Sequence, residues 1–418
     1  MHCEASIAML KSNFPNLAVG NERSIIMKKI KLGLLPKLAL GILIGVILGF
    51  VANEQLMSVI GAVKGVMGSI IFFAVPLVIF GFVTPAITGL KENASKMLGV
   101  YLGLSYGSAV GASLFSVLAG YAIIPFLNIS NQASQLKELP APAFELAIPP
   151  VMPVMSALVL AILVGLSVIW TKAEQMDNLL NEIQKMILSI VEKIIIPILP
   201  IFVAATFAGL AYEGTFTQQL PIFFKMVIIV LIGHFIWLAL LYGIGGLVSK
   251  KNPLEVVKHY GPTYLTAMGT MSSAATLPVA LECASKSKVL PEKIVNFAIP
   301  LGATTHLCGS VLTETFFCMT IAQILYGSMP SFGTMLMFSL LFGVFAVGAP
   351  GVPGGTVMAS LAIVISILGF DETGVGLLMA IFAIQDSFGT ACNVTGDGAL
   401  ALILRGIFYD TDGNLKSA

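Results

Sequence analysis

The chain has 418 residues, of which 57% are hydrophobic and 10% are charged, and its formal net charge is +1. Because ordinary soluble domains carry about 25% charged residues, this composition predicts a polytopic membrane protein. The near-neutral charge gives no reason to expect a nucleic-acid partner. The five cysteines have the spacing of neither a zinc site nor a disulfide framework.

The first 26 residues are polar and show no periodic pattern, and they precede the sequence Met27-Lys-Lys-Ile-Lys. We interpret residues 1–26 as a disordered tail or a non-native extension, with the native start at Met27. No signal peptide precedes the first apolar run, so we expect the first helix itself to direct membrane insertion.

Six apolar runs of membrane-spanning length follow, at about 34–52, 59–88, 97–126, 151–171, 186–212 and 221–248. Lysines lie before the first run and after the second, fourth and sixth, whereas the loops 127–148 and 213–220 hold Lys137 alone. Since positive charge favours the cytoplasmic side, this alternation predicts a multi-pass protein of the plasma (inner) membrane with a cytoplasmic N-terminus.

The remaining third of the chain contains interrupted apolar segments. Residues 262–285 have lysines at both ends, which predicts a re-entrant hairpin with its tip at Ser272–Pro278. Residues 333–370 lack flanking lysines and predict a second hairpin, entered from outside, with its tip at Pro350–Gly355. Each hairpin precedes a span predicted to break, at His306–Ser310 and at Asn393–Gly398, and the second span returns the C-terminus to the cytoplasm. Inverted repeats of interrupted segments are typical of secondary transporters.

The last span carries a polar stripe. Asp386, Thr390, Asn393 and Asp397 are offset by 0, 4, 7 and 11 residues, which places them on one narrow face of a helix. A carboxylate in mid-bilayer costs roughly 3 kcal/mol on insertion scales, so the stripe predicts a protein-lined site for cations or amines. The alternative is a pair of buried aspartates that only hold helices together.

Four motifs on these segments resemble the dicarboxylate/amino acid:cation symporter family, the glutamate and neutral amino acid transporters. They are Ser272-Ser-Ala-Ala-Thr-Leu-Pro-Val279, Pro300-Leu-Gly-Ala-Thr304, Gly351-Val-Pro-Gly354 and Asn393-Val-Thr-Gly-Asp397. The resemblance covers the chain from Met27 to its end. It implies an all-α membrane protein with eight transmembrane helices, two re-entrant hairpins and an elevator mechanism.

The resemblance also implies a division of the chain and a homotrimeric assembly. Spans one, two, four and five (27–96 and 151–212) would form a static trimerisation scaffold. Spans three and six, the hairpins and the last two spans (97–126 and 221–406) would form the moving transport domain. Residues 407–418 would be a cytoplasmic tail.

Family roles carry over to matching positions. Asp386 would receive the α-ammonium group of an amino acid, Asn393 its α-carboxylate, and Thr390 would face its side chain. Asp397 would ligate Na⁺ with backbone carbonyls near Gly302, His306 and Asn393. The other residues expected to bind the substrate are Ser272, Ser273, Ser310, Val352 and Gly354.

Three departures from the family pattern bear on its function. Members that take acidic substrates carry an arginine at one of two positions that are Met271 and Gly389 here, so we predict a small neutral substrate such as serine, threonine or alanine. Gly389 should also leave extra room. Cys308 replaces an aspartate that helps to hold Na⁺, which predicts fewer coupled ions. Glu314 matches a proton-carrying glutamate and, with His306, is a candidate proton site.

The sequence therefore predicts a Na⁺-coupled symporter without an organic cofactor, with proton coupling or an acidic substrate as alternatives. An intramembrane aspartyl protease is disfavoured because Asp386 and Asp397 lie about 16 Å apart on one helix, whereas a catalytic dyad needs carboxyls in contact. An anion channel is a further alternative, since aqueous cavities between broken helices also suit conduction.

Overall fold

The computed structural model describes residues 34–88, 96–127, 129, 137–146 and 148–410. Within these ranges the chain is built of helices and their connections, which agrees with the all-α fold that the family resemblance implies. The residues interpreted as an extension (1–26), the start at Met27 and the tail after residue 410 lie outside the described part of the chain.

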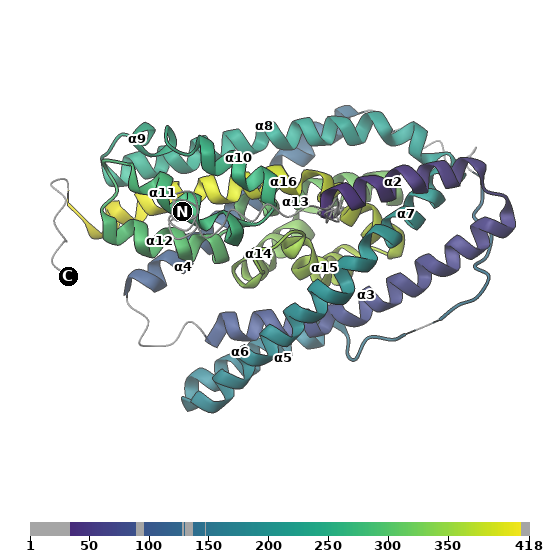
Figure 1. Cartoon of the computed structure of the whole chain (residues 1–418), viewed down its shortest axis with the longest axis horizontal. Helices are drawn as coiled ribbons and strands as arrows, with labels where there is room; N and C mark the ends of the chain where they lie inside the picture. Colours follow the sequence, from purple (N-terminus) through teal and green to yellow (C-terminus); the bar gives the residue numbers. More distant parts are fainter. Residues whose placement is uncertain (1–33, 89–95, 128, 130–136, 147, 411–418) are drawn as a thin grey trace, which may run out of the picture. The chain divides into compact units, whose positions relative to one another are not determined.

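The first half of the described chain forms long helices that follow the predicted apolar runs (Figure 1). They are α2 (Leu34–Val51), α3 (Glu54–Thr88), α4 (Lys96–Ile123), α5 (Val154–Thr171), α6 (Glu174–Ile190), α7 (Ile196–Glu213) and α8 (Thr215–Ser249). The predicted fifth span began at residue 186, but the helix begins at Glu174 and continues through a π-helical turn, Val191–Ile195, into α7. Pro197 has no N–H to bond to the preceding turn, which favours this irregularity.

The second half consists of shorter helices and one long one. They are α9 (Leu254–Val257), α10 (Gly261–Thr270), α11 (Ser273–Ser285), α12 (Glu292–Thr305), α13 (Cys308–Tyr326), α14 (Phe332–Gly348), α15 (Gly355–Leu368) and α16 (Glu372–Phe408). The long helix α16 packs against α8, α10, α12 and α13 (Figure 1).

Six helices in the described part of the chain are long and apolar enough to cross a membrane. They lie within Glu54–Pro85, Lys96–Leu127, Glu174–Glu213, Pro221–Ser249, Glu292–Tyr326 and Glu372–Phe408. Shorter apolar helices occur at Pro36–Val51, Val159–Thr171, Phe332–Gly348 and Gly355–Leu368. A multi-pass membrane protein follows, while the predicted total of eight spans and two re-entrant hairpins stays a prediction.

The interruptions fall partly where the sequence predicts them. Helices α12 and α13 are separated only by His306 and Leu307, so the predicted break is present but shorter. The turn between α10 and α11 consists of Met271 and Ser272, because Ser272 caps α11 by accepting a hydrogen bond from the Ala275 N–H at 3.2 Å. The segment from Ser273 to Pro278, which was expected to belong to the hairpin tip, is helical. Residues 349–354 separate α14 from α15, as expected.

The predicted break at Asn393–Gly398 is wrong, since α16 is continuous. Its glycines permit close packing instead of unwinding. A Cβ at Gly396 would lie 2.8 Å from the His306 ring, and one at Gly398 would lie 2.6 Å from the Tyr242 hydroxyl. The Thr395 hydroxyl bonds within the helix to the Ala391 carbonyl at 2.7 Å. All polar groups of this stretch are thus accommodated without a broken backbone.

Helices α2 and α7 pack unusually closely along a row of glycines. Cβ atoms at Gly41, Gly45 and Gly49 would lie 2.6, 2.2 and 2.3 Å from backbone carbonyl oxygens of α7. Small residues at every fourth position allow helix backbones to approach in this way inside a membrane, where apolar burial alone gives little association.

Helix α3 also contacts the start of α16. The Lys64 ammonium donates to the Thr373 hydroxyl at 3.0 Å. One turn further along α3, a Cβ at Gly68 would lie 3.2 Å from the Glu372 carboxyl carbon, so this glycine admits the carboxylate beside the helix.

We expect Gly45→Leu to destabilise the protein by about 1–3 kcal/mol, because the added side chain must force α2 away from α7. Gly103→Leu is the matched control, since a Cβ there meets nothing within 4 Å. Thermal unfolding of both variants in detergent, followed by circular dichroism, checks this. Equal midpoints for the two variants would contradict the close packing of α2 on α7.

Candidate substrate and ion site

The polar stripe of α16 lies inside the protein. Asp386 and Thr390 are each 4% exposed, and Asn393 and Asp397 are each 1% exposed. A lipid-facing stripe would be untenable for two carboxylates, so this burial confirms that the stripe is lined by protein. Asp386, Asn393 and Asp397 each meet an end or an interruption of another helix.

Asp386 lies beside the turn between α14 and α15. One of its carboxylate oxygens accepts a hydrogen bond from the Gly354 N–H at 2.8 Å, and the other lies 3.4 Å from the Thr390 hydroxyl. Gly354 has a φ of 73°, which favours glycine, and it immediately precedes α15. The carboxylate therefore faces the positive end of that helix.

Asn393 lies at the start of α13. Its side-chain oxygen accepts hydrogen bonds from the N–H groups of Gly309 and Ser310, at 2.7 and 3.1 Å. Its amide nitrogen donates to the Ser310 hydroxyl at 2.9 Å. The first N–H groups of a helix form a ready site for anions, so this corner has the donors that a carboxylate needs.

Asp397 forms the other end of the stripe and is linked to the break between α12 and α13. Its carboxylate lies 3.0 Å from Nδ1 of His306, whose Nε2 lies 2.9 Å from the Ser108 hydroxyl of α4. A Cβ at Gly302 would lie 2.6 Å from the Asp397 carboxylate and 2.5 Å from the Tyr101 hydroxyl. The predicted ion residues Gly302, His306 and Asp397 are therefore brought together.

The turn between α10 and α11 meets the turn between α14 and α15. The Ser272 hydroxyl donates to the Gly351 carbonyl at 2.7 Å, and the Ala274 N–H donates to the same carbonyl at 3.3 Å. Ser273 is buried beside it. The Val352 carbonyl accepts from the Gly355 N–H within the second turn. The two predicted hairpin tips thus touch each other next to Asp386.

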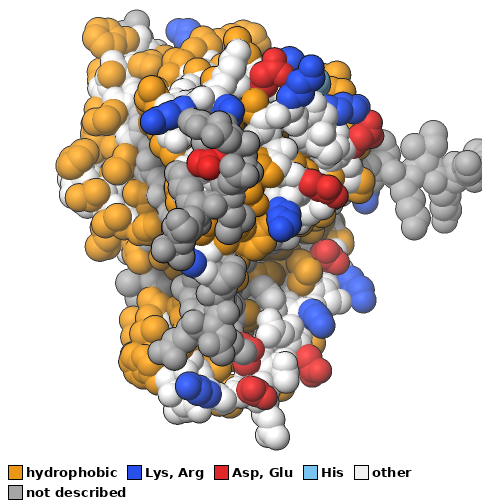
Figure 2. Space-filling view, turned by 90° about the vertical axis from the view of Figure 1, so that its left-hand side faces the viewer, with side chains coloured by type: hydrophobic (Ala, Val, Ile, Leu, Met, Phe, Trp, Pro, Cys, Tyr) orange, Lys and Arg blue, Asp and Glu red, His pale blue; other side chains and the backbone are white. Residues whose placement is uncertain are grey.

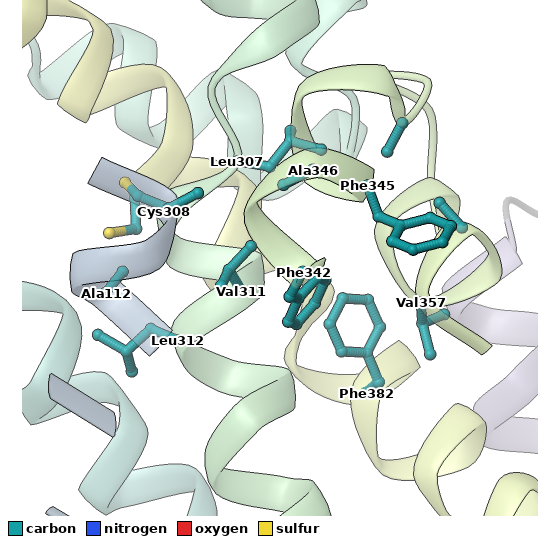
Figure 3. Close-up of a cluster of buried hydrophobic side chains, with 14 of the residues drawn as sticks. Ala112, Leu307, Cys308, Val311, Leu312, Phe342, Phe345, Ala346, Val357 and Phe382 are labelled. Carbon is teal, nitrogen blue, oxygen red and sulfur yellow. The ribbon is translucent and has the colours of Figure 1, made fainter. Parts of the chain in front are cut away.

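A cavity of 10 Å³ remains beside Asp386, about the volume that one water needs. Met271, Gly354 and Phe382 line it, together with Leu38 of α2 and Leu199 of α7. Phe342, Phe345 and Phe382 all belong to the buried apolar core near this place (Figure 3). An amino acid could enter this place only if the turns moved apart, so the structure shows a closed conformation.

Gly389 does not leave the extra room that was expected. A Cβ there would lie 3.3 Å from the Ser310 hydroxyl and 3.4 Å from the Ser310 Cα, because the start of α13 packs directly on this glycine. That expectation is wrong in the closed conformation. Arginine is also absent from the site: in the described part of the chain the single arginine, Arg405, donates to the carbonyls of Ser249 and Asp410.

The remaining candidates lie deeper in the same bundle. Cys308 is fully buried at the start of α13 and is not in a disulfide. Glu314 is fully buried, and one of its oxygens accepts a short hydrogen bond from the Ser360 hydroxyl. Its other oxygen has no hydrogen-bond partner among the described residues.

Sequence reasoning missed the residues that other spans contribute. Ser108 and Tyr101 of α4 reach the ion end, and His234 of α8 lies 2.9 Å from the Thr313 hydroxyl and 3.0 Å from the Gly309 carbonyl at the start of α13. A signal existed for α4, since Tyr101, Ser105 and Ser108 recur at helical spacing within an apolar span and all are buried.

The sequence of the chain is similar to that of known transporters. Residues 34–407 match the sequence model of the sodium:dicarboxylate symporter family. Excitatory amino acid transporter 2 of Homo sapiens is 31% identical over 228 residues, 53% of this chain and 38% of the human protein. An excitatory amino acid transporter of Caenorhabditis elegans is 33% identical over 149 residues, 36% of this chain and 29% of that protein. The chain thus spans well under two thirds of the length of these relatives.

We expect Asn393→Ala to lower the free energy of unfolding by about 1–3 kcal/mol, because it leaves two buried N–H groups of α13 without an acceptor. Asn393→Asp retains an acceptor at the same helix start and should stay closer to the wild type. Thermal unfolding in detergent without substrate measures both. Equal losses in the two variants would show that the cap on α13 contributes nothing.

Proposed function

Because the chain belongs to the sodium:dicarboxylate symporter family, we propose that it is a Na⁺-coupled symporter of a small neutral amino acid. Family membership supports a membrane transporter over an enzyme.

Asp386 and the start of α13 offer the two charges that an amino acid requires. The Asp386 carboxylate, in a closed and buried place, suits an α-ammonium group. Asn393 and the N–H groups of Gly309 and Ser310 suit an α-carboxylate at a helix start. On entry the substrate would replace contacts that these groups now make with each other, as Thr390 does with Asp386.

Among the described residues no guanidinium group lies at the polar stripe, and this observation favours a neutral substrate. Arg405 is 19 residues from Asp386 on the same helix, which is about 28 Å along the axis. Its guanidinium group binds the carbonyl at the end of α8. A second carboxylate on the substrate would be buried without a bidentate partner, at a cost of several kcal/mol.

Na⁺ would bind at the end of the stripe that holds Asp397. The Asp397 carboxylate and the Gly302 carbonyl, which both now accept hydrogen bonds from His306, would supply oxygen ligands, and backbone carbonyls do not depend on the residue at 308. Each Na⁺ moving down 100 mV contributes about 2.3 kcal/mol, and a tenfold gradient adds about 1.4 kcal/mol. Two ions would therefore sustain roughly a 10⁵-fold substrate gradient.

Movement would take place between two sets of helices, as in an elevator. Helix α2 packs along α7 and α3 packs along α5, whereas α16 packs on α8, α10 and α13, and α4 packs on α13 and α14. This pairing supports the proposed division into a scaffold (27–96 and 151–212) and a transport domain (97–126 and 221–406). A homotrimer formed by the scaffold is part of the same proposal.

Proton coupling is a second candidate, favoured by the unpartnered oxygen of Glu314. An ionised carboxylate with an unsatisfied oxygen is costly in a fully buried place, so this geometry suits a carboxyl group that carries a proton.

In proteoliposomes with an inward Na⁺ gradient, we expect labelled serine to accumulate and labelled aspartate not to. Asp386→Asn should lower serine uptake roughly tenfold or more, because a charge-assisted contact with the ammonium group is lost. Glu282→Gln, which removes an exposed carboxylate of α11, is the matched control. A Na⁺ ionophore should abolish accumulation, which a channel would never have produced.

Accumulation of aspartate but not of serine, alanine or threonine would overturn the substrate class and leave the symport intact. Met271→Arg sharpens the test, since Met271 borders the cavity beside Asp386. The added guanidinium group should let aspartate compete with serine, whereas Met271→Gln should not.

For the proton candidate, an inward proton gradient without a Na⁺ gradient should increase serine uptake by the wild type. Glu314→Gln should abolish this increase and retain Na⁺-driven uptake, because glutamine keeps an acceptor for Ser360 but cannot carry a proton. If the proton gradient has no effect on wild-type uptake, Glu314 is a structural residue.

A further inference from the structure

A second cavity lies away from the polar stripe, between α8 and the segment that contains α9 and α10. It has a volume of 540 Å³ and is lined almost wholly by apolar and aromatic side chains. At one end the rings of Phe235 and Tyr264 stack, with centroids 6.1 Å apart. Phe235 is 58% exposed and Leu254, on α9, is 63% exposed, so the groove opens to the outside of the protein.

Two glycines keep this groove open. Gly243 of α8 and Gly261 of α10 both line it, and a Cβ added to either would meet nothing within 4 Å. Neither glycine is needed for close packing of helices, in contrast to those of α2. The groove therefore has unfilled space along its length and apolar walls, which suits a hydrocarbon chain.

Positive charge lies at one end of the groove. Lys250 and Lys251 follow α8 directly and precede Pro253, which lines the groove, by three and two residues. Among the described residues no carboxylate forms an ion pair with Lys250 or Lys251, whereas Lys258 pairs with Glu255 at 2.7 Å. Gly243 is seven residues before Lys250, about 10 Å along α8. Figure 2 shows one face of the molecule, on which basic and acidic side chains lie beside a broad hydrophobic area.

The inner wall of the groove reaches the ion end of the polar stripe. Tyr242 lines the groove and donates its hydroxyl to the Thr395 carbonyl of α16 at 2.9 Å. Tyr260 lines it too, and both tyrosine hydroxyls lie within 2.9 Å of the Cβ position of Gly398, the neighbour of Asp397. A molecule bound in the groove would therefore contact Tyr242 and Tyr260, which in turn contact this part of α16.

We propose that the groove between α8 and α9–α10 binds one anionic phospholipid, with an acyl chain along Gly243 and the headgroup on Lys250 and Lys251. The occupant is a lipid because the groove is apolar, open and part of a membrane-embedded face, and it is anionic because two unpaired lysines close one end. The bound chain supports Tyr242 and Tyr260 against α16. This inference does not rest on the proposed substrate.

The test uses the full chain, delipidated in detergent and titrated with dioleoyl phosphatidylglycerol or dioleoyl phosphatidylcholine, with retained lipid counted by native mass spectrometry. The wild type should hold one phosphatidylglycerol roughly 30-fold more tightly than phosphatidylcholine, as expected for two lysines near an anionic headgroup. The double variant Lys250→Gln/Lys251→Gln should lose this preference. Lys172→Gln/Lys185→Gln, with the same change in net charge and both lysines exposed elsewhere, should keep it.

Gly243→Leu should abolish retention of phosphatidylglycerol by filling the groove, and Gly103→Leu should not. Gly261→Leu fills the same groove from the opposite wall, so it tests the proposal if Gly243→Leu does not fold. Equal affinity of the wild type for the two lipids, or unchanged retention in the folded groove-filling variants, would overturn the proposal.

Discussion

Burial of polar groups in an apolar medium is the constraint on which the rest of this structure depends. The stripe on α16 places two carboxylates and an amide where water is excluded, and each is matched by an exposed backbone end or an interruption of another helix. The Gly354 N–H, just before α15, donates to Asp386, and an N–H at the start of α13 donates to Asn393. The break between α12 and α13 brings His306 to Asp397. The ends of the short helices in the second half thus lie beside the buried polar groups of α16, which could not be left without partners.

Much of this arrangement is predictable from the sequence, because periodicity and turn chemistry are local properties. The stripe, the break before α13 and the turn before α15 all follow from residue spacing and from glycine and proline content. The continuous α16 does not, since glycine signals a break and close packing equally well, and only the neighbouring Tyr242 and His306 decide between them. The partners Ser108 and His234 depend on tertiary contacts, which no local pattern specifies.

The closed site also shows why the room for a substrate cannot be inferred from one small residue in the sequence. Gly389 has no side chain, yet Ser310 occupies the volume that its absence frees. Met271, Phe382 and the side chains of α2 and α7 enclose what remains beside Asp386. Room for a substrate is therefore a property of how far the two turns separate, and not of any single small residue. By contrast, the groove beside α8 has free space at Gly243 and Gly261, because no neighbouring atom lies within 4 Å of where their Cβ atoms would be.

The contact of Lys64 with Thr373 joins one helix of the proposed scaffold to the first turn of the helix that carries the whole stripe. If the two sets of helices slide past each other, this hydrogen bond and the packing of Glu372 against Gly68 must break in every transport cycle. A lysine that binds no substrate would then act as a latch. Its strength would determine how long the protein waits in this conformation, and hence the speed of turnover rather than the affinity for cargo.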